Sequence, residues 1–195
     1  MAGSAKYMVV LDACTLYSST VRNLLLTIGS ETDLYHARWT KQIQQEWFDN
    51  LIAKRPDLDA AKLRMTQQQM TEAIPDSEIT NHEPLIRCLE LPDKDDNHVL
   101  AAAIVGHADA IVTFNTRDFP AEYLATFNIE AQHPDDFVVN QLELHTLKAI
   151  GAIKAMRLKY RKPALTVEDL IARLERNQLP LTAAWLRNEN VSRLI

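Results

Sequence analysis

The stretch Tyr7-Met8-Val9-Val10-Leu11-Asp12 decides the fold class of this chain. A continuous apolar run that ends at an acid is typical of a strand buried on both faces, as in a parallel sheet. Similar apolar runs recur at residues 110–114 and, more weakly, at residues 129–131. Helical patterns separate them, and strands that alternate with helices predict an α/β domain with a parallel sheet.

The helices between these strands follow from apolar residues at helical spacing and from residues that cap or break helices. Thr15 or Ser19 begins the first, which runs to Gly29. Residues 34–39 fit either a turn or a short extended piece. Further helices are expected from residue 40 to about residue 55, over residues 57–74 and 83–89, after the acidic turn at 92–96, and as a turn over 122–127.

The chain has no evident strand after residue 136. One long helix is expected over residues 139–160, weakened at Gly151. Thr166 and Asp169 resemble a capping box at the start of a helix, and Pro180 begins a last one. We therefore place an α/β body at residues 1–137 and an all-helical region at residues 138–195.

The composition is that of an ordinary globular protein. The 195 residues are 47% hydrophobic and 24% charged, with only 4 Gly, which excludes disordered and low-complexity classes. The two cysteines have neither disulfide-framework nor zinc-site spacing. No apolar run is long enough for a membrane helix, and the start of the chain has no features of a secretory signal. A soluble protein of a reducing compartment, the cytoplasm, is expected.

Charge is distributed unevenly along the chain. Residues 1–137 carry 11 Lys and Arg against 21 Asp and Glu, whereas residues 138–195 carry 10 against 5. The stretch from Lys148 to Lys162 holds basic residues with no acid between them. Such asymmetry indicates either nucleic-acid contact or a plain solvated helix face.

Carboxylates gather around the strand ends. Asp12 ends the first strand, Asp118 follows the second, and Asp96 opens the helix before the second strand. Ligands of parallel sheets bind at this edge, and converging carboxylates repel one another unless a cation lies among them. Hard divalent cations such as Mg²⁺ and Mn²⁺ take oxygen ligands and activate water for phosphodiester hydrolysis.

Each acid also has a plain structural interpretation. Asp12 and Asp96 suit helix capping, Asp118 a turn, and Glu46 a solvated helix face. His98 lies near the same edge and suits a role that supports the acids.

Other chemistries lack their motifs. The chain has no Gly-rich phosphate loop, no G-x-S-x-G elbow and no HExxH pair. Haloacid-dehalogenase phosphatases need a second Asp two residues after the first, and Cys14 stands at that position. Cys14 itself is expected to be a small packed side chain.

Taken together and in order, these motifs resemble the PIN domain, the nuclease fold of VapC-type toxins, over residues 7–137. The resemblance rests on residues 9–13, on Glu46, on the Asp93-Lys94-Asp95-Asp96-Asn97-His98 segment with the Val-Leu-Ala-Ala-Ala run after it, and on residues 111–120. It is nearest to the branch with Leu-Pro-Asp before the third acid and a helical C-terminal region, which includes some larger VapC toxins.

The resemblance implies a three-layer α/β/α fold with a central parallel sheet, followed here by a C-terminal helical extension. It also implies an endoribonuclease dependent on Mg²⁺ or Mn²⁺, the toxin of a type II toxin–antitoxin pair. By position, Asp12, Glu46 and Asp96 would be catalytic metal ligands. Asn115 stands where many relatives have Asp, so Asp118 is expected to be the fourth acid. Thr113 is expected to orient a carboxylate or water.

The family further implies an RNA substrate, with transfer RNA as one class, a cognate antitoxin that occludes the acids, and a homodimer. The charge asymmetry makes Lys154, Arg157 and Lys159 candidate contacts to the RNA backbone. A rival interpretation is a nucleic-acid-binding regulator with an inactive PIN-like body, in which the last two helices form a helix-turn-helix. A metal-dependent phosphatase of small substrates is a further alternative.

Overall fold

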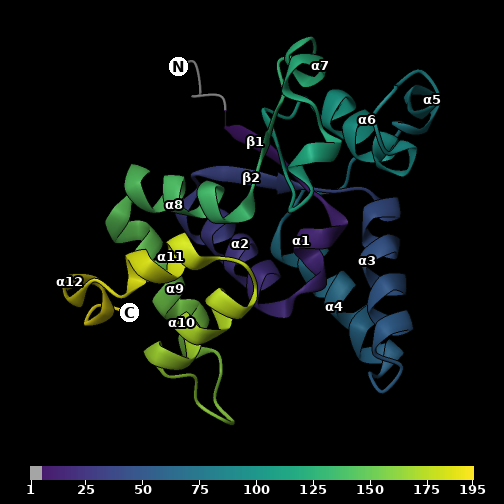
Figure 1. Ribbon diagram of the computed structural model, residues 1–195. Coiled ribbons are helices and arrows are strands. Elements are labelled where there is room, and N and C mark those ends of the chain that lie inside the picture. The colour runs from purple at the N-terminus through teal and green to yellow at the C-terminus, as the bar shows by residue number, and fades with distance from the viewer. Residues whose placement is uncertain (1–5) are drawn as a thin grey trace. The chain divides into compact units, whose positions relative to one another are not determined.

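The computed structural model describes residues 6–195, which form two compact units (Figure 1). The first unit contains the chain up to Tyr17 together with Tyr35–His133. The second contains Ser18–Leu34 together with Pro134–Ile195. The second unit is therefore discontinuous in sequence.

Four parallel strands form the sheet of the first unit, in the order β2-β1-β3-β4. The central strand β1 is fully buried at Val9, Val10 and Leu11, which explains its uninterrupted apolar sequence. The three expected strands are present, and the ambiguous residues 34–39 contain the fourth. The bounds are β1 Tyr7–Leu11, β2 Tyr35–Arg38, β3 Ala110–Val112 and β4 Glu130–Gln132.

The order of the strands reverses beside β1. The chain leaves β1 to form β2 on one side of it, and it later forms β3 on the other side. The carboxyl ends of β1 and β3 therefore flank a topological switch point, where open α/β sheets bind ligands. Asp12 follows β1 directly, and Thr113 follows β3 directly.

Two helices of the first unit carry residues of this edge. In α3 the side chain of Thr40 caps the N-terminus by accepting from Ile43 N, and Trp47 anchors the helix in the core. The helix α6 packs on both β1 and β3 and is buried at every residue from Asn97 to Ala103. The helices of this unit are α1 Ala13–Tyr17, α3 Lys41–Lys54, α4 Ala60–Ala73, α5 Glu83–Ile86, η1 Lys94–Asp96, α6 Asn97–Val105, η2 Thr116–Asp118 and α7 Ala121–Ala125.

The second unit is helical. Helix α2 packs against α9 and α10, and the capping box of Thr166 and Asp169 at the start of α10 is confirmed. The bounds are α2 Ser19–Thr32, α8 Pro134–Leu144, α9 Thr146–Leu158, α10 Val167–Arg176, α11 Pro180–Leu186 and α12 Glu189–Ser192.

The expected single helix over residues 139–160 is wrong. The helix begins earlier, at Pro134, and the chain breaks at His145, whose φ of −149° and ψ of 68° are not helical. Gly151 lies inside α9, exposed and with no atom near the position of a Cβ. A glycine on an exposed helix face costs only about 1 kcal/mol, which the burial of α9 offsets.

The α/β fold with a central parallel sheet and additional C-terminal helices is as predicted. Among residues 6–195, no helix is both long enough and apolar enough to cross a membrane.

Candidate functional site

Asp12 is held rigidly at the end of β1. It is only 4% exposed, and its backbone N–H donates to Val112 O across 3.1 Å. Its Oδ2 accepts hydrogen bonds from Thr113 Oγ1 at 2.6 Å and from Cys14 Sγ at 3.0 Å. Burial raises the pKa of Asp12 above its ordinary value, and the two donors partly counter this effect.

The two donors to Asp12 are themselves fixed by the backbone of the chain after β3. Asn115 N donates to Thr113 Oγ1 at 3.0 Å, and Phe114 N donates to Cys14 Sγ at 3.3 Å. Burial raises the pKa of Cys14, so it remains a thiol and keeps its proton for Asp12. Sequence reasoning assigned Cys14 to packing alone and missed this contact.

Glu46 reaches the site from α3. Its Oε2 lies 3.1 Å from Nε2 of His98, which stands in the first turn of α6. The two side chains differ in exposure, at 41% for Glu46 and 6% for His98. The contact joins residues from two helices that are far apart in sequence.

Asp96 lies half-buried where η1 meets α6. Its pKa is raised to about 7, most of all by burial and then by the negative charges of four neighbouring acids. These acids, in descending order of effect, are Asp12, Asp93, Asp118 and Glu46. Asp12, Glu46 and Asp118, the other three acids expected from the sequence, therefore lie within electrostatic reach of Asp96.

Asn97 sets the position of the loop that carries the acids before α6. Its Oδ1 accepts from Leu91 N at 3.0 Å, and its Nδ2 donates to Leu89 O at 2.9 Å. Asp93 caps η1 by accepting from Asp95 N at 2.9 Å. The sequence analysis did not single out Asn97.

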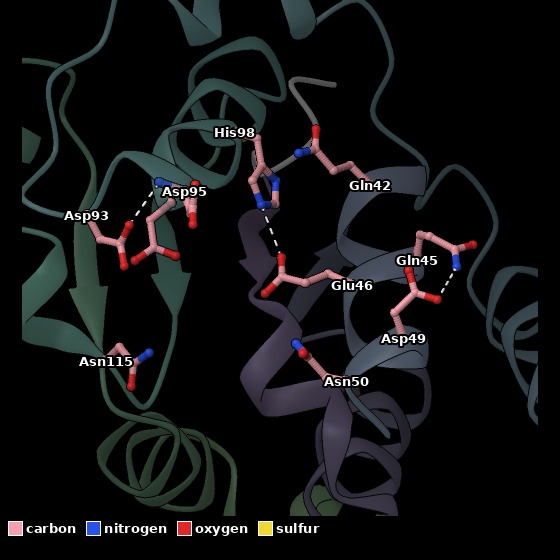
Figure 2. Close-up of a pocket in the computed structure, with 10 residues that line it drawn as sticks. Gln42, Gln45, Glu46, Asp49, Asn50, Asp93, Asp95, His98 and Asn115 are labelled. Carbon is pink, nitrogen blue, oxygen red and sulfur yellow. Dashed lines mark hydrogen bonds and ion pairs between the residues drawn. The ribbon is translucent and has the colours of Figure 1, made fainter. Parts of the chain in front are cut away.

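A cavity of about 600 Å³ opens beside these residues. Figure 2 shows Asp93, Asp95 and Asn115 on one side and Glu46 and Asn50 of α3 on the other. No Lys or Arg is among the described residues that line it, so the cavity carries a negative potential. The lining comprises Gln42, Gln45, Glu46, Asp49, Asn50, Asp93, Asp95, Asp96, His98 and Asn115.

Sequence reasoning also missed the polar face that α3 presents to this cavity. Gln42, Glu46 and Asn50 follow one another at intervals of four residues, so they lie on one side of the helix. This spacing was visible in the sequence, but it is equally typical of a solvated helix face.

The donor chemistry of the site fits a hard divalent cation, because the candidate ligands are carboxylate oxygens that repel one another. Within residues 6–195, however, no group of three or more His, Cys, Asp or Glu side chains is placed closely enough to hold a metal ion. Binding a cation therefore requires some of these carboxylates to move closer to the others.

The basic residues that are candidate contacts to the RNA backbone lie in the second unit. Lys154 Nζ donates to Leu194 O at 3.1 Å, and Arg157 donates to the backbone oxygens of Leu165 at 2.8 Å and Ile195 at 3.3 Å. These two side chains therefore hold the C-terminal segment. Lys159 is exposed at the end of α9.

Comparison with known proteins gives matches over both parts of the chain. The sequence model of the PIN domain matches residues 8–117, and that of the VapC50 C-terminal domain matches residues 134–188. A curated protein of Mycobacterium tuberculosis (strain ATCC 25618 / H37Rv), "Putative ribonuclease VapC50", is 40% identical over 92 residues. That match covers 47% of this chain and 54% of the relative, so the chain spans about half the length of the relative it matches. No solved structure matches the chain significantly. The PIN match covers more than half of the chain, and the chain belongs to the PIN domain family.

Proposed function

We propose that this protein is an endoribonuclease that depends on Mg²⁺ or Mn²⁺ and hydrolyses RNA phosphodiester bonds. The observation that carries the proposal is the convergence of Asp12, Glu46 and Asp118 on Asp96, whose pKa is raised to about 7 by burial and by the charges of its acidic neighbours. Clustered acids with a raised pKa are typical of functional sites, and a divalent cation would relieve their repulsion. Membership in the PIN family and the similarity to a protein named as a ribonuclease support the same activity.

Asp12, Glu46, Asp96 and Asp118 would hold the cation. A divalent cation in such a site activates water and stabilises the charge that develops on the phosphate. Thr113 and Cys14 keep Asp12 in place by donating to its Oδ2, so this ligand needs little reorganisation. Without the cation the pKa of Asp96 is about 7, so this acid would give up its proton when it binds the cation.

The cavity supports an RNA phosphate as substrate only when the acids are neutralised, since no described basic side chain lines it. In this proposal the second unit supplies the attraction for RNA through its basic residues, Lys154, Arg157 and Lys159. Because Lys154 and Arg157 are bonded to backbone oxygens, the exposed Lys159, Arg161 and Lys162 take the larger share.

The cleavage test uses purified protein, total RNA and either Mg²⁺ or Mn²⁺, beside EDTA. Asp12→Asn and Asp96→Asn keep the size of each side chain and remove its charge, and both should abolish cleavage. Asp57→Asn is the matched control, because this exposed acid pairs with Arg55 at 2.6 Å. Cleavage that survives EDTA or both site variants would refute the proposal.

We further propose that the protein is the cytoplasmic toxin of a toxin–antitoxin pair, that it forms a homodimer, and that transfer RNA is among its targets. The match to the VapC50 C-terminal domain supports this assignment. Expression of the wild type in bacteria should arrest growth, and Asp12→Asn should not. Sequencing of the cut ends identifies the RNA class, and light scattering after gel filtration reports the oligomeric state.

The rival regulator receives little support from α11, its candidate recognition helix. The sequence of α11, Pro180–Leu186, contains no Lys or Arg to contact a phosphate. A protein that binds nucleic acid but cleaves none under any of these conditions would favour the regulator.

A further inference from the structure

We propose that His98 is a positioning residue that holds Glu46 in the orientation needed to bind the divalent cation. This inference rests on the proposed function, since it concerns the same site. The juxtaposition that carries it is the 3.1 Å contact between His98 Nε2 and Glu46 Oε2.

The two partners differ in burial. The His98 side chain is 6% exposed and belongs to the run of α6 residues that is buried throughout. Glu46 is 41% exposed, and a glutamate on an exposed helix face has several accessible rotamers. A fixed donor on α6 therefore selects one orientation for a side chain that packing on α3 does not hold.

The chemistry of the contact determines which atoms remain free. A carboxylate only accepts hydrogen bonds, so Nε2 of His98 carries the proton in this contact. Only one of the two Glu46 oxygens is used, and Figure 2 shows the other directed toward the cavity side that holds Asp93 and Asn115. The carboxylate thus keeps an oxygen for a cation while the imidazole fixes its plane.

Nδ1 is the other polar atom of the His98 ring. Nδ1 of His98 is buried without a hydrogen-bond partner among the described residues. Burying a polar ring in this way is unfavourable if the ring only fills space. The contact with Glu46 is thus the polar interaction that accounts for a histidine at this position.

The consequence is that one segment controls two proposed ligands. Asp96 precedes His98 by two residues, so the start of α6 supplies one ligand itself and orients another on α3. Outer hydrogen bonds of this kind typically change metal affinity by about 10–100-fold.

The test measures Mn²⁺ binding to the full-length protein from the electron paramagnetic resonance signal of free Mn²⁺. His98→Leu retains bulk without a donor and should raise the Kd by about 10–100-fold. His98→Gln carries an amide nitrogen near the position of Nε2 and should recover most of the affinity. His98→Asn is too short to reach Glu46 and should behave like His98→Leu, which provides a second donor-free variant if the leucine does not fold.

Two controls separate positioning from packing. His36→Leu removes a half-buried imidazole of β2 and should leave the Kd unchanged. In a Glu46→Ala background, His98→Leu should cause no further loss, since a positioning residue acts only through its partner. Thermal melting of every variant verifies that it is folded.

The outcomes distinguish this inference from the proposed function. The role of His98 alone is overturned if His98→Leu binds Mn²⁺ with the Kd of the wild type. It is also overturned if His98→Leu weakens binding as much in the Glu46→Ala background as in the wild type. Failure of the wild type to bind Mn²⁺ at all overturns the proposed cation and the role of His98 together.

Discussion

Thr113 donates a hydrogen bond from Oγ1 to Oδ2 of Asp12 across 2.6 Å, and this bond joins the ends of the two central strands at the switch point of the sheet. The hydroxyl oxygen of Thr113 also accepts a hydrogen bond from Asn115 N, so the hydroxyl proton of Thr113 is directed at Asp12. The most buried acid of the site is thereby held by the neighbouring strand.

Thr113→Val should therefore weaken both Mn²⁺ binding and RNA cleavage by about 10–100-fold, because it removes the donor at nearly constant volume. Thr113→Ser keeps the hydroxyl and should stay close to the wild type. Equal Kd values and cleavage rates for the valine variant and the wild type would show that Cys14 alone suffices to orient Asp12.

The raised pKa of Asp96 predicts an effect on stability that depends on pH. Its pKa of about 7 in the folded protein lies above the ordinary 3.8, so the folded state binds the proton more tightly than the unfolded state. The free energy of unfolding of the metal-free protein therefore falls as the pH rises from about 4 to about 7. Asp96→Asn should stabilise the protein at pH 8, by about 1–2 kcal/mol after allowance for solvent screening at this half-buried group, and much less at pH 4.

Thermal melting of both proteins at the two pH values checks this prediction. Asp57→Asn, in an exposed ion pair with a lowered pKa for Asp57, should not reproduce the stabilisation at pH 8. The same melting temperature for wild type and Asp96→Asn at pH 8 would contradict the repulsion among the acids.

The same titration should appear in cation binding. Asp96 must lose its proton to act as a ligand, so the affinity for Mg²⁺ should rise with pH through about 7 and then level off. Calorimetric titration with Mg²⁺ in buffers of different ionisation enthalpy reports the proton released per cation. An affinity that does not change between pH 6 and pH 8 would remove Asp96 from the ligand set.

Asp135 predicts a stability effect in the second unit. This 2%-exposed carboxylate accepts from Leu181 N at 2.7 Å, from Thr182 N at 2.8 Å and from Thr182 Oγ1 at 2.7 Å, so α8 caps the start of α11. Asp135→Ala should lower the free energy of unfolding by about 2–4 kcal/mol. Urea unfolding followed by tryptophan fluorescence measures this change, with Asp136→Ala at the exposed neighbouring residue as the control.

The basic residues of the second unit should separate into two groups. Alanine at Lys159, Arg161 and Lys162 should weaken RNA binding and reduce the slope of log K against log salt concentration by about 0.7 for each phosphate that is no longer neutralised. Arg157→Ala should instead lower the melting temperature, because Arg157 holds two backbone oxygens. Unchanged salt dependence in the triple variant would place the RNA-binding surface elsewhere.

The sequence alone was most informative where burial dictates composition. Residues 7–11 could be assigned because a strand covered on both faces contains only apolar residues, whereas the edge strand Tyr35–Arg38 mixes buried and half-buried positions and remained ambiguous. Helix propensity predicted one long helix weakened at Gly151, but the backbone turns at His145, between the packed helices α8 and α9.

The site could be anticipated only in part for a similar reason. The acids follow strands or begin helices, which local patterns reveal, and the family resemblance selects among them. The contact between His98 and Glu46 joins residues on two different helices, and the bond from Cys14 to Asp12 requires knowledge of a side-chain rotamer. Neither contact produces a periodic pattern that could be recognised in a single sequence.

The discontinuity of the second unit constrains the order in which the chain can fold. Helix α2 emerges from the ribosome on the order of a hundred residues before α9 and α10, the helices it packs against, and such non-local contacts slow folding. Its buried side chains, among them Val21, Leu25 and Ile28, must stay soluble until synthesis reaches the last third of the chain. A chain shortened after His133 would lose those partners, so the fragment should aggregate during translation instead of accumulating as a free first unit.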